Sequence, residues 1–106
     1  MKNKYKIPWH VRQYVKKELM DYKSNKKLLS KLNGNTRELL LISSRLKQIE
    51  NVLERLNKED REAAEIIFFE KYTQAGAEIY KGITKNIYYY TMNKVIYLTA
   101  VEMDLI

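Results

Sequence analysis

Six polar residues near the C-terminus have side chains and a spacing that suit recognition of a nucleic acid. Their separations alternate between one and three positions, which places them along one side of an α-helix. An Asn side chain has the donor and acceptor that read adenine, whereas Lys reads guanine or holds a phosphate. The stretch therefore predicts contacts to DNA bases and backbone from Lys85, Asn86, Tyr89, Tyr90, Asn93 and Lys94.

Two threonines and a glycine place this stretch in a larger pattern. Thr73 and Thr84 are suited to cap helices, and Gly82 and Ile83 stand between them. In a helix-turn-helix, a first helix of about eight residues is followed by a turn that contains Gly, and a second helix enters the major groove of DNA. We predict this motif, with a last helix over 85–102 and with Thr84 at the DNA surface. A plain helix–glycine–helix corner has much the same pattern and stays an alternative.

The last helix is expected to pack against the rest of the protein along its whole length. Its buried side is predicted from residues at helical spacing, which are Tyr88, Met92, Val95, Ile96, Thr99 and Met103. The run Tyr88–Tyr90 also offers rings that could stack on single-stranded bases. Because at most two of the three rings share one face of a helix, we assign Tyr88 to the core and keep stacking as an alternative.

A basic amphipathic helix is predicted at the start of the chain, from Pro8 to Leu32. Pro8 suits the first helical position because its missing N–H needs no partner there. The apolar side consists of Val11, Val15, Leu19, Tyr22, Leu29 and Leu32, interrupted at Lys26. The other side carries Lys16, Lys17, Lys23, Lys27 and Lys31. These lysines form either a solvated face or a phosphate-contacting one, for which Lys16, Lys23 and Lys27 are the candidates.

A turn at 33–35 and a second long helix follow. Gly34 can end the first helix, and Thr36 can cap the next. The second helix has a heptad seam of about two and a half heptads, formed by Leu39, Ile42, Leu46, Ile49, Leu53 and Leu56. Two long helices joined by a short turn should form an antiparallel hairpin. The seam then faces the first helix, the C-terminal part or a second copy of the chain, and the last option predicts a homodimer.

The third helix is expected to begin after Asn57, a suitable cap, and to end near Lys71. Its buried face is predicted to be Ala63, Ala64, Ile67, Phe68 and Tyr72. The chain is therefore predicted to be all-α, with an N-terminal antiparallel helical hairpin over 8–56 followed by a three-helix helix-turn-helix unit over 57–106. At 106 residues, these parts form a single domain, 1–106.

The net charge of +7 is concentrated at the N-terminal end of the chain. Residues 1–32 contain ten Lys or Arg and two acidic residues, a net of +8; residues 33–62 contain six of each sign, a net of 0. Residues 63–106 contain four Lys and five acidic residues, a net of −1. The attraction to a polyanion is therefore expected from the first helix rather than from the last.

Enzymatic chemistry has little support in the sequence. There is no Cys, and His10 is the only His, so thiolate nucleophiles are excluded and a metal site lacks its usual ligands. Glu59 and Asp60 are adjacent and do not face each other on a helix, and the favourable dipole at a helix start explains both. We expect no enzyme, no metal and no cofactor. The absence of a signal-peptide pattern after Met1, and of any run of roughly 20 apolar residues, predicts a cytoplasmic protein with no membrane partner.

Three segments resemble a known family. The stretches Leu56–Glu62, Ile67–Tyr72 and Ile83–Tyr90 are similar to small phage and prophage transcriptional regulators of the ArpU and RinA type. The resemblance covers residues 56–100, and Ile7-Pro8-Trp9 before a basic helix is a looser match. It implies a C-terminal part similar to region 4 of sigma-70 factors, with a helix-turn-helix that binds double-stranded DNA.

Two functions follow as hypotheses. The first is a sequence-specific DNA-binding transcriptional regulator, in which the last helix reads bases and the first helix attracts phosphate. The second is a protein-binding module that docks on RNA polymerase, or inhibits a host protein such as a defence protein, through its Tyr-rich last helix. Tyrosine enrichment is typical of protein interfaces. The chain also has no Arg after Arg61, and it has Tyr90 and Thr91 where the family usually has Arg.

Overall fold

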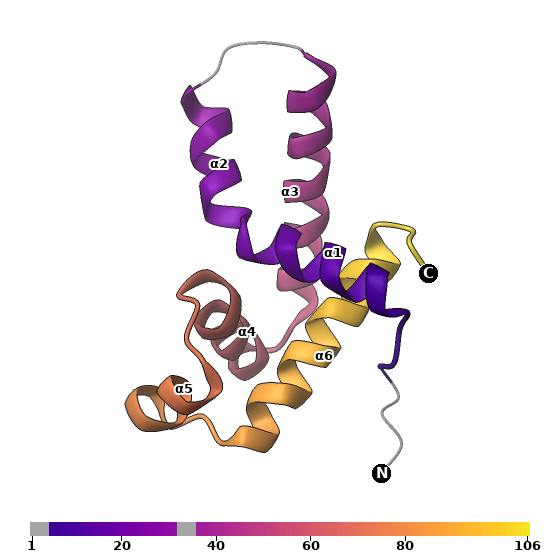
Figure 1. Cartoon of the computed structure of the whole chain (residues 1–106). Helices are drawn as coiled ribbons and strands as arrows, with labels where there is room; N and C mark the ends of the chain where they lie inside the picture. Colours follow the sequence, from indigo (N-terminus) through magenta and orange to yellow (C-terminus); the bar gives the residue numbers. More distant parts are fainter. Residues whose placement is uncertain (1–4, 32–35) are drawn as a thin grey trace.

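The computed structural model describes residues 5–31 and 36–106, and within them it contains helices and no strands, which confirms the all-α prediction. Residues 1–4, Leu32 and the predicted turn at 33–35 lie outside the described residues. In chain order the elements are α1 (Trp9–Met20), α2 (Tyr22–Lys31), α3 (Arg37–Arg55), α4 (Lys58–Ala64), the π-helical turn η1 (Glu65–Phe69), α5 (Gln74–Lys81) and α6 (Lys85–Glu102) (Figure 1).

The first predicted helix is two helices, and the prediction of one continuous helix over 8–32 was wrong. The chain bends at Asp21, whose φ of −88° and ψ of 1° lie outside the helical region. Backbone hydrogen bonds continue on both sides, from Asp21 N–H to the Lys17 carbonyl at 2.9 Å and from Asn25 N–H to the Asp21 carbonyl at 2.8 Å. The bend lets α1 pack on α6 and η1 while α2 packs on α3.

The helical hairpin consequently consists of α2 and α3, which lie side by side in Figure 1, and it does not include α1. The residues of the heptad seam are unevenly buried. Leu46, Ile49 and Leu56 are buried in the core, whereas Leu39, Ile42 and Leu53 are only partly buried. At the far end of the hairpin Leu28, Leu40 and Leu41 remain exposed.

The third helix begins at its predicted cap, because the Asn57 side chain accepts a hydrogen bond from Asp60 N–H at 2.8 Å. After Ala64 it widens into η1, in which Glu70 N–H donates to the Glu65 carbonyl at 2.8 Å. The predicted buried residues Ala63, Ala64, Ile67 and Phe68 are buried, and Tyr72 is half-buried.

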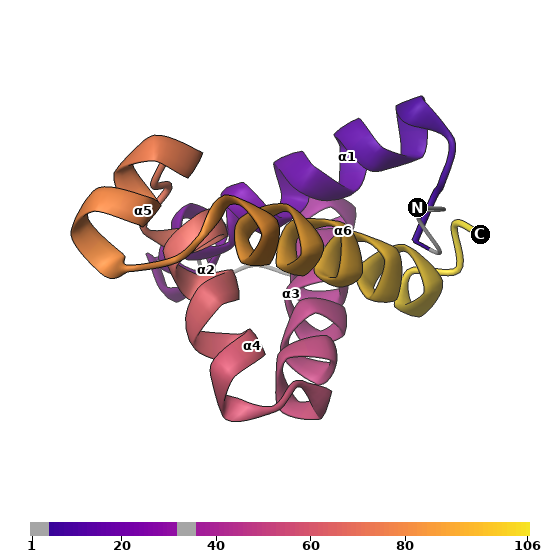
Figure 2. The same cartoon turned by 90° about the horizontal axis from the view of Figure 1, so that it is seen from below.

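One cluster of buried apolar side chains holds these elements together. It has members on all seven of them, such as Val15 on α1, Ile49 on α3, Ile67 on η1 and Ile96 on α6. Figure 2 shows α6 lying across the middle of the molecule, with α1 on one side and α3 and α4 on the other. The fold therefore buries one side of α6 and positions its first turns at an edge.

No helix within residues 5–31 and 36–106 is both long enough and apolar enough to cross a membrane.

Candidate nucleic-acid interface

The helix-turn-helix pattern is built from hydrogen bonds that the sequence predicts. The Thr73 hydroxyl accepts from Gly76 N–H at 3.1 Å and caps α5, and the Thr84 hydroxyl accepts from Ile87 N–H at 3.3 Å and caps α6. Between them Gly82 adopts a left-handed φ of 69°. Ile83 N–H then donates to the Ala77 carbonyl at 3.1 Å, which closes the end of α5. The predicted caps at Thr73 and Thr84 and the predicted bounds of the last helix are confirmed.

The buried side of α6 also agrees with the prediction. All six predicted core positions are buried, from Tyr88 to Met103. Thr91 and Ala100 are buried in addition, and neither was among the predicted core positions. Since Thr91 faces inward, it has no place at a nucleic-acid surface.

Tyr88 anchors the start of α6. Its hydroxyl donates a hydrogen bond to the Tyr72 carbonyl at 2.8 Å, in the segment that leads into α5. Burial raises the pKa of the Tyr88 phenol, with a smaller contribution from neighbouring Tyr89. Tyr88 is a core residue, as predicted, and it sets the position of α6 relative to the chain before α5.

Five of the seven residues predicted to bind DNA are exposed together around the first turns of α6. They are Thr84, Lys85, Asn86, Tyr89 and Tyr90. Asn93 lies further along the helix and is half-buried. The exposed set presents one cation, one amide and two phenol rings, which are groups that can contact base edges and phosphate.

Lys94 departs furthest from the prediction. Its ammonium donates a hydrogen bond to the Asp60 carboxylate at 2.7 Å, and its side chain is only 24% exposed. The hydrogen bond to Asp60 is the main reason why the pKa of Lys94 is raised. Lys94 therefore joins α6 to α4. The prediction that it lies with the exposed DNA-binding residues was wrong.

The N-terminal segment lies beside the middle of α6. The Tyr5 ring contacts the Tyr90 ring, with centroids 5.9 Å apart, and the Tyr97 ring, with centroids 5.4 Å apart. The Lys94 ammonium lies 5.9 Å from the Tyr90 centroid. Tyr90 is thus held among other side chains, whereas Lys85, Asn86 and Tyr89 lie at the outer end of the helix.

The lysines of α1 share a groove with Lys71, which was not among the predicted site residues. Lys16 and Lys17 line a shallow groove of about 340 Å³ together with Lys71, which lies two residues before the Thr73 cap. Lys71 has a positive φ of 59°, which is uncommon for a residue with a Cβ. The groove brings the basic first helix next to the start of the helix-turn-helix. A tertiary contact creates this proximity, so spacing along the chain carries no signal for it.

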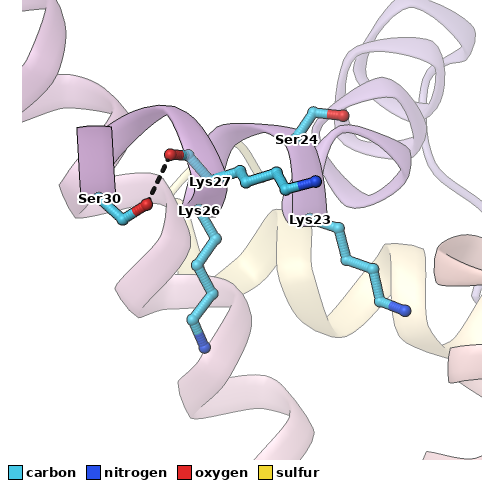
Figure 3. A pocket seen from close by; sticks show the side chains of 5 residues that line it. All are labelled: Lys23, Ser24, Lys26, Lys27 and Ser30. Carbon is cyan, nitrogen blue, oxygen red and sulfur yellow. Dashed lines mark hydrogen bonds between the residues drawn. The ribbon is translucent and has the colours of Figure 1, made fainter. Parts of the chain in front are cut away.

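The lysines of α2 continue the basic surface. Figure 3 shows Lys23 and Lys26 pointing away from α2 and Lys27 running along it, so that the three ammonium groups end apart from one another, and Ser30 donates a hydrogen bond to the Lys27 carbonyl at 2.7 Å. Lys26 lies 3.5 Å from a carboxylate oxygen of Glu50. Because the ammonium groups diverge, this surface suits an extended polyanion better than one small anion.

Two carboxylates moderate the positive charge of the α1 and α2 lysines, Glu50 beside Lys26 and Asp21 beside Lys17. Lys17 contacts Asp21 at 3.1 Å, and this hydrogen bond raises the pKa of Lys17. Neither Lys16, Lys23 nor Lys27 forms an ion pair within the part of the chain that the structure describes. The three predicted phosphate contacts are therefore available to an external anion.

Among the described residues there is no group of three or more His, Asp and Glu side chains that could hold a metal ion.

Comparison with protein-family models, with curated proteins and with solved structures gives no match to this chain.

Proposed function

We propose that this protein is a DNA-binding transcriptional regulator of the small phage type, with α6 as its recognition helix. The observation that carries the proposal is the combination of α5, the left-handed Gly82 and α6, with Lys85, Asn86 and Tyr89 exposed at the start of α6. Lys16 and Lys17 of α1 line one groove with Lys71, which lies shortly before the start of α5. In this proposal α6 supplies the groups that read bases, and these lysines supply the groups that bind phosphate.

Base readout is tested by replacing Asn86 with Ala. We expect this change to weaken binding to a specific site by about 1–3 kcal/mol while weak binding to unrelated DNA persists. Asn93→Ala should have a smaller effect because Asn93 is half-buried. Fluorescence anisotropy with labelled fragments of host and phage DNA measures both affinities. Equal losses on specific and unrelated DNA would argue against base contacts from α6.

Phosphate attraction is tested through the dependence of affinity on salt. Replacing Lys16, Lys23 and Lys27 together with Ala should weaken binding to every sequence and lower the salt slope, because fewer counterions are released. The matched control replaces the exposed Lys6, Lys47 and Lys58, which changes the net charge equally. Undetectable binding of the unchanged protein at low salt would overturn the DNA proposal.

A second candidate function is docking on a protein, such as RNA polymerase or a host defence protein. It is favoured by the large apolar side chains exposed on the helix-turn-helix, which include Ile79, Tyr80, Ile87, Tyr89 and Tyr90. Such residues are typical of protein interfaces. In this case Tyr89→Ala and Tyr90→Ala should abolish capture of purified RNA polymerase without any change in DNA affinity.

We further propose that the protein forms a homodimer. The buried part of the seam, at Leu46 and Ile49, is already covered within the chain. The exposed Leu28, Leu40 and Leu41 at the end of the hairpin are the apolar side chains left for a second copy. Light scattering at tens of micromolar should give the dimer mass, and Leu40→Ser with Leu41→Ser should give the monomer. A monomeric wild type contradicts the proposal.

A further inference from the structure

A groove of about 330 Å³ lies beside the start of α6, on the side of α4. The start of α6 lies between α4 and α5, as Figure 2 shows. The apolar part of the groove is formed by Ala63 on α4, Ile66 on η1, Ile83 in the turn and Ile87 on α6. Ile87 is half exposed, so the groove presents an apolar surface to the outside.

Carboxylates form the rim of this groove. Glu59 and Glu62 line it from α4, three residues apart and therefore on one side of that helix. Both are exposed, and neither forms an ion pair within residues 5–31 and 36–106. The other charged groups of the lining are already neutralised, because Asp60 is paired with Lys94 and Lys81 with Glu70. On a chain of net charge +7, the groove is thus locally acidic.

Large apolar side chains are also exposed on α5. Lys81, the last residue of α5, lines the groove, and Ile79 and Tyr80 directly before it are 73% and 74% exposed. Side chains of this size gain free energy when a partner covers them. The two free carboxylates repel phosphate, so DNA is not a suitable occupant of the groove.

We propose that this groove binds a basic amphipathic helix of a partner protein. Leucine-sized side chains at positions i, i+3, i+4 and i+7 of that helix would cover the isoleucines, and its Lys or Arg residues would pair with Glu59 and Glu62. The proposal rests on the protein-docking candidate and gives that candidate a surface and a partner chemistry. It does not depend on DNA binding.

The test uses a fluorescein-labelled peptide of Leu and Lys, about 14 residues or four helical turns long, with Leu at these spacings. We expect anisotropy to show binding to the full chain with a Kd of roughly tens of micromolar at physiological salt. Replacing Glu59 and Glu62 with Lys should weaken the binding of this peptide by at least about tenfold. Ile87→Ser, which leaves all charges unchanged, should weaken it as well.

The matched control is Glu38→Lys with Glu54→Lys, which changes the net charge equally at exposed positions on α3 and should leave the affinity unchanged. Circular dichroism melts establish that every variant is folded. No binding to the wild type at 500 μM, a concentration about tenfold above the expected Kd, overturns the proposal, as does equal binding to the Glu59→Lys, Glu62→Lys variant. A wild-type dimer that this variant dissociates would make a second copy the occupant instead. If the peptide fails to bind while Tyr89→Ala still abolishes polymerase capture, the groove proposal fails and the docking candidate stands.

Discussion

The ammonium group of Lys94 donates a hydrogen bond to the Asp60 carboxylate at 2.7 Å across 34 residues of sequence. The contact fastens the middle of α6 to the first turn of α4, and both side chains are largely buried. A cation in this position stabilises the placement of α6 rather than meeting solvent. Lys85, at the exposed start of the same helix, has no such partner among the described residues.

Lys94 and Lys85 should therefore respond differently to the same substitution. Lys94→Met leaves Asp60 without its cation and should lower the free energy of unfolding by about 1 kcal/mol or more. Lys85→Met should change it by less than about 0.5 kcal/mol. Urea unfolding of Lys85→Met, Lys94→Met, Asp60→Asn and the Asp60→Asn, Lys94→Met double variant measures the coupling between Lys94 and Asp60. Independent, additive effects in this cycle would mean that the two side chains do not interact in solution.

The buried middle of the heptad seam and the exposed Leu40 beside its first residue should respond differently to substitution. Leu46→Ala and Ile49→Ala remove buried side chains and should each lower the free energy of unfolding by about 2–5 kcal/mol. Leu40→Ala, at a position 59% exposed on the same helix, should have an effect within about 0.5 kcal/mol. Thermal melts compare the three variants. A midpoint close to that of the wild type for Ile49→Ala would contradict the burial of the seam.

The helix starts could be predicted from the sequence because the chemistry that fixes them is local. Thr36, Asn57, Thr73 and Thr84 each accept a hydrogen bond from the backbone N–H three residues later. Such a contact needs only the side chain and the turn that it caps. The left-handed conformation at Gly82 is equally local, since Gly adopts it without a Cβ clash.

The features that the sequence did not reveal depend on contacts between distant segments. The bend at Asp21 separates two helices with different neighbours. Before it, α1 packs on α6 and η1, and after it, α2 packs on α3. At this point the Tyr22 ring stacks on Phe69, with centroids 4.8 Å apart. The proximity of Lys71 to Lys16 has the same kind of origin. Helical periodicity identifies which side of a helix is apolar, but it does not identify the neighbour that covers that side.

Thr99 and Thr36 should give opposite responses to replacement by Val. The Thr99 hydroxyl is buried and has no hydrogen-bond partner within the described residues, so Thr99→Val should leave stability unchanged or raise it by about 1 kcal/mol. Thr36→Val removes the cap of α3 and should lower stability by about 1 kcal/mol. Urea midpoints measure both. A marked loss of stability in Thr99→Val would show that its hydroxyl is hydrogen-bonded in solution.

Tyr22 should make stability decline at high pH. Burial, and a hydrogen bond of 2.7 Å that its hydroxyl donates to Glu50, raise its pKa from 10.0 to about 12. Because the folded-state pKa lies above the unfolded one, this stabilisation is complete below pH 10 and is lost as the pH rises from about 10 to 12. Urea midpoints of the wild type and Tyr22→Phe, measured from pH 8 upward, should differ most at pH 8 and converge through this range. A difference that does not change with pH would contradict the raised pKa.

Lys71 combines an unfavourable backbone conformation with a position in the basic groove. One substitution at Lys71 should therefore change stability and DNA affinity in opposite directions. Its φ of 59° is strained for a residue with a Cβ, and Tyr72 N–H donates to the Ile66 carbonyl at 3.1 Å around it. Lys71→Gly should remove this strain and raise the free energy of unfolding by about 1 kcal/mol. The same change removes a cation beside Lys16 and Lys17, so it should weaken DNA binding and lower the salt slope by about one. Lys71→Arg, which keeps the charge and the strain, should leave both quantities close to those of the wild type. A Lys71→Gly variant that is more stable but binds DNA as the wild type does would place the DNA backbone away from this groove.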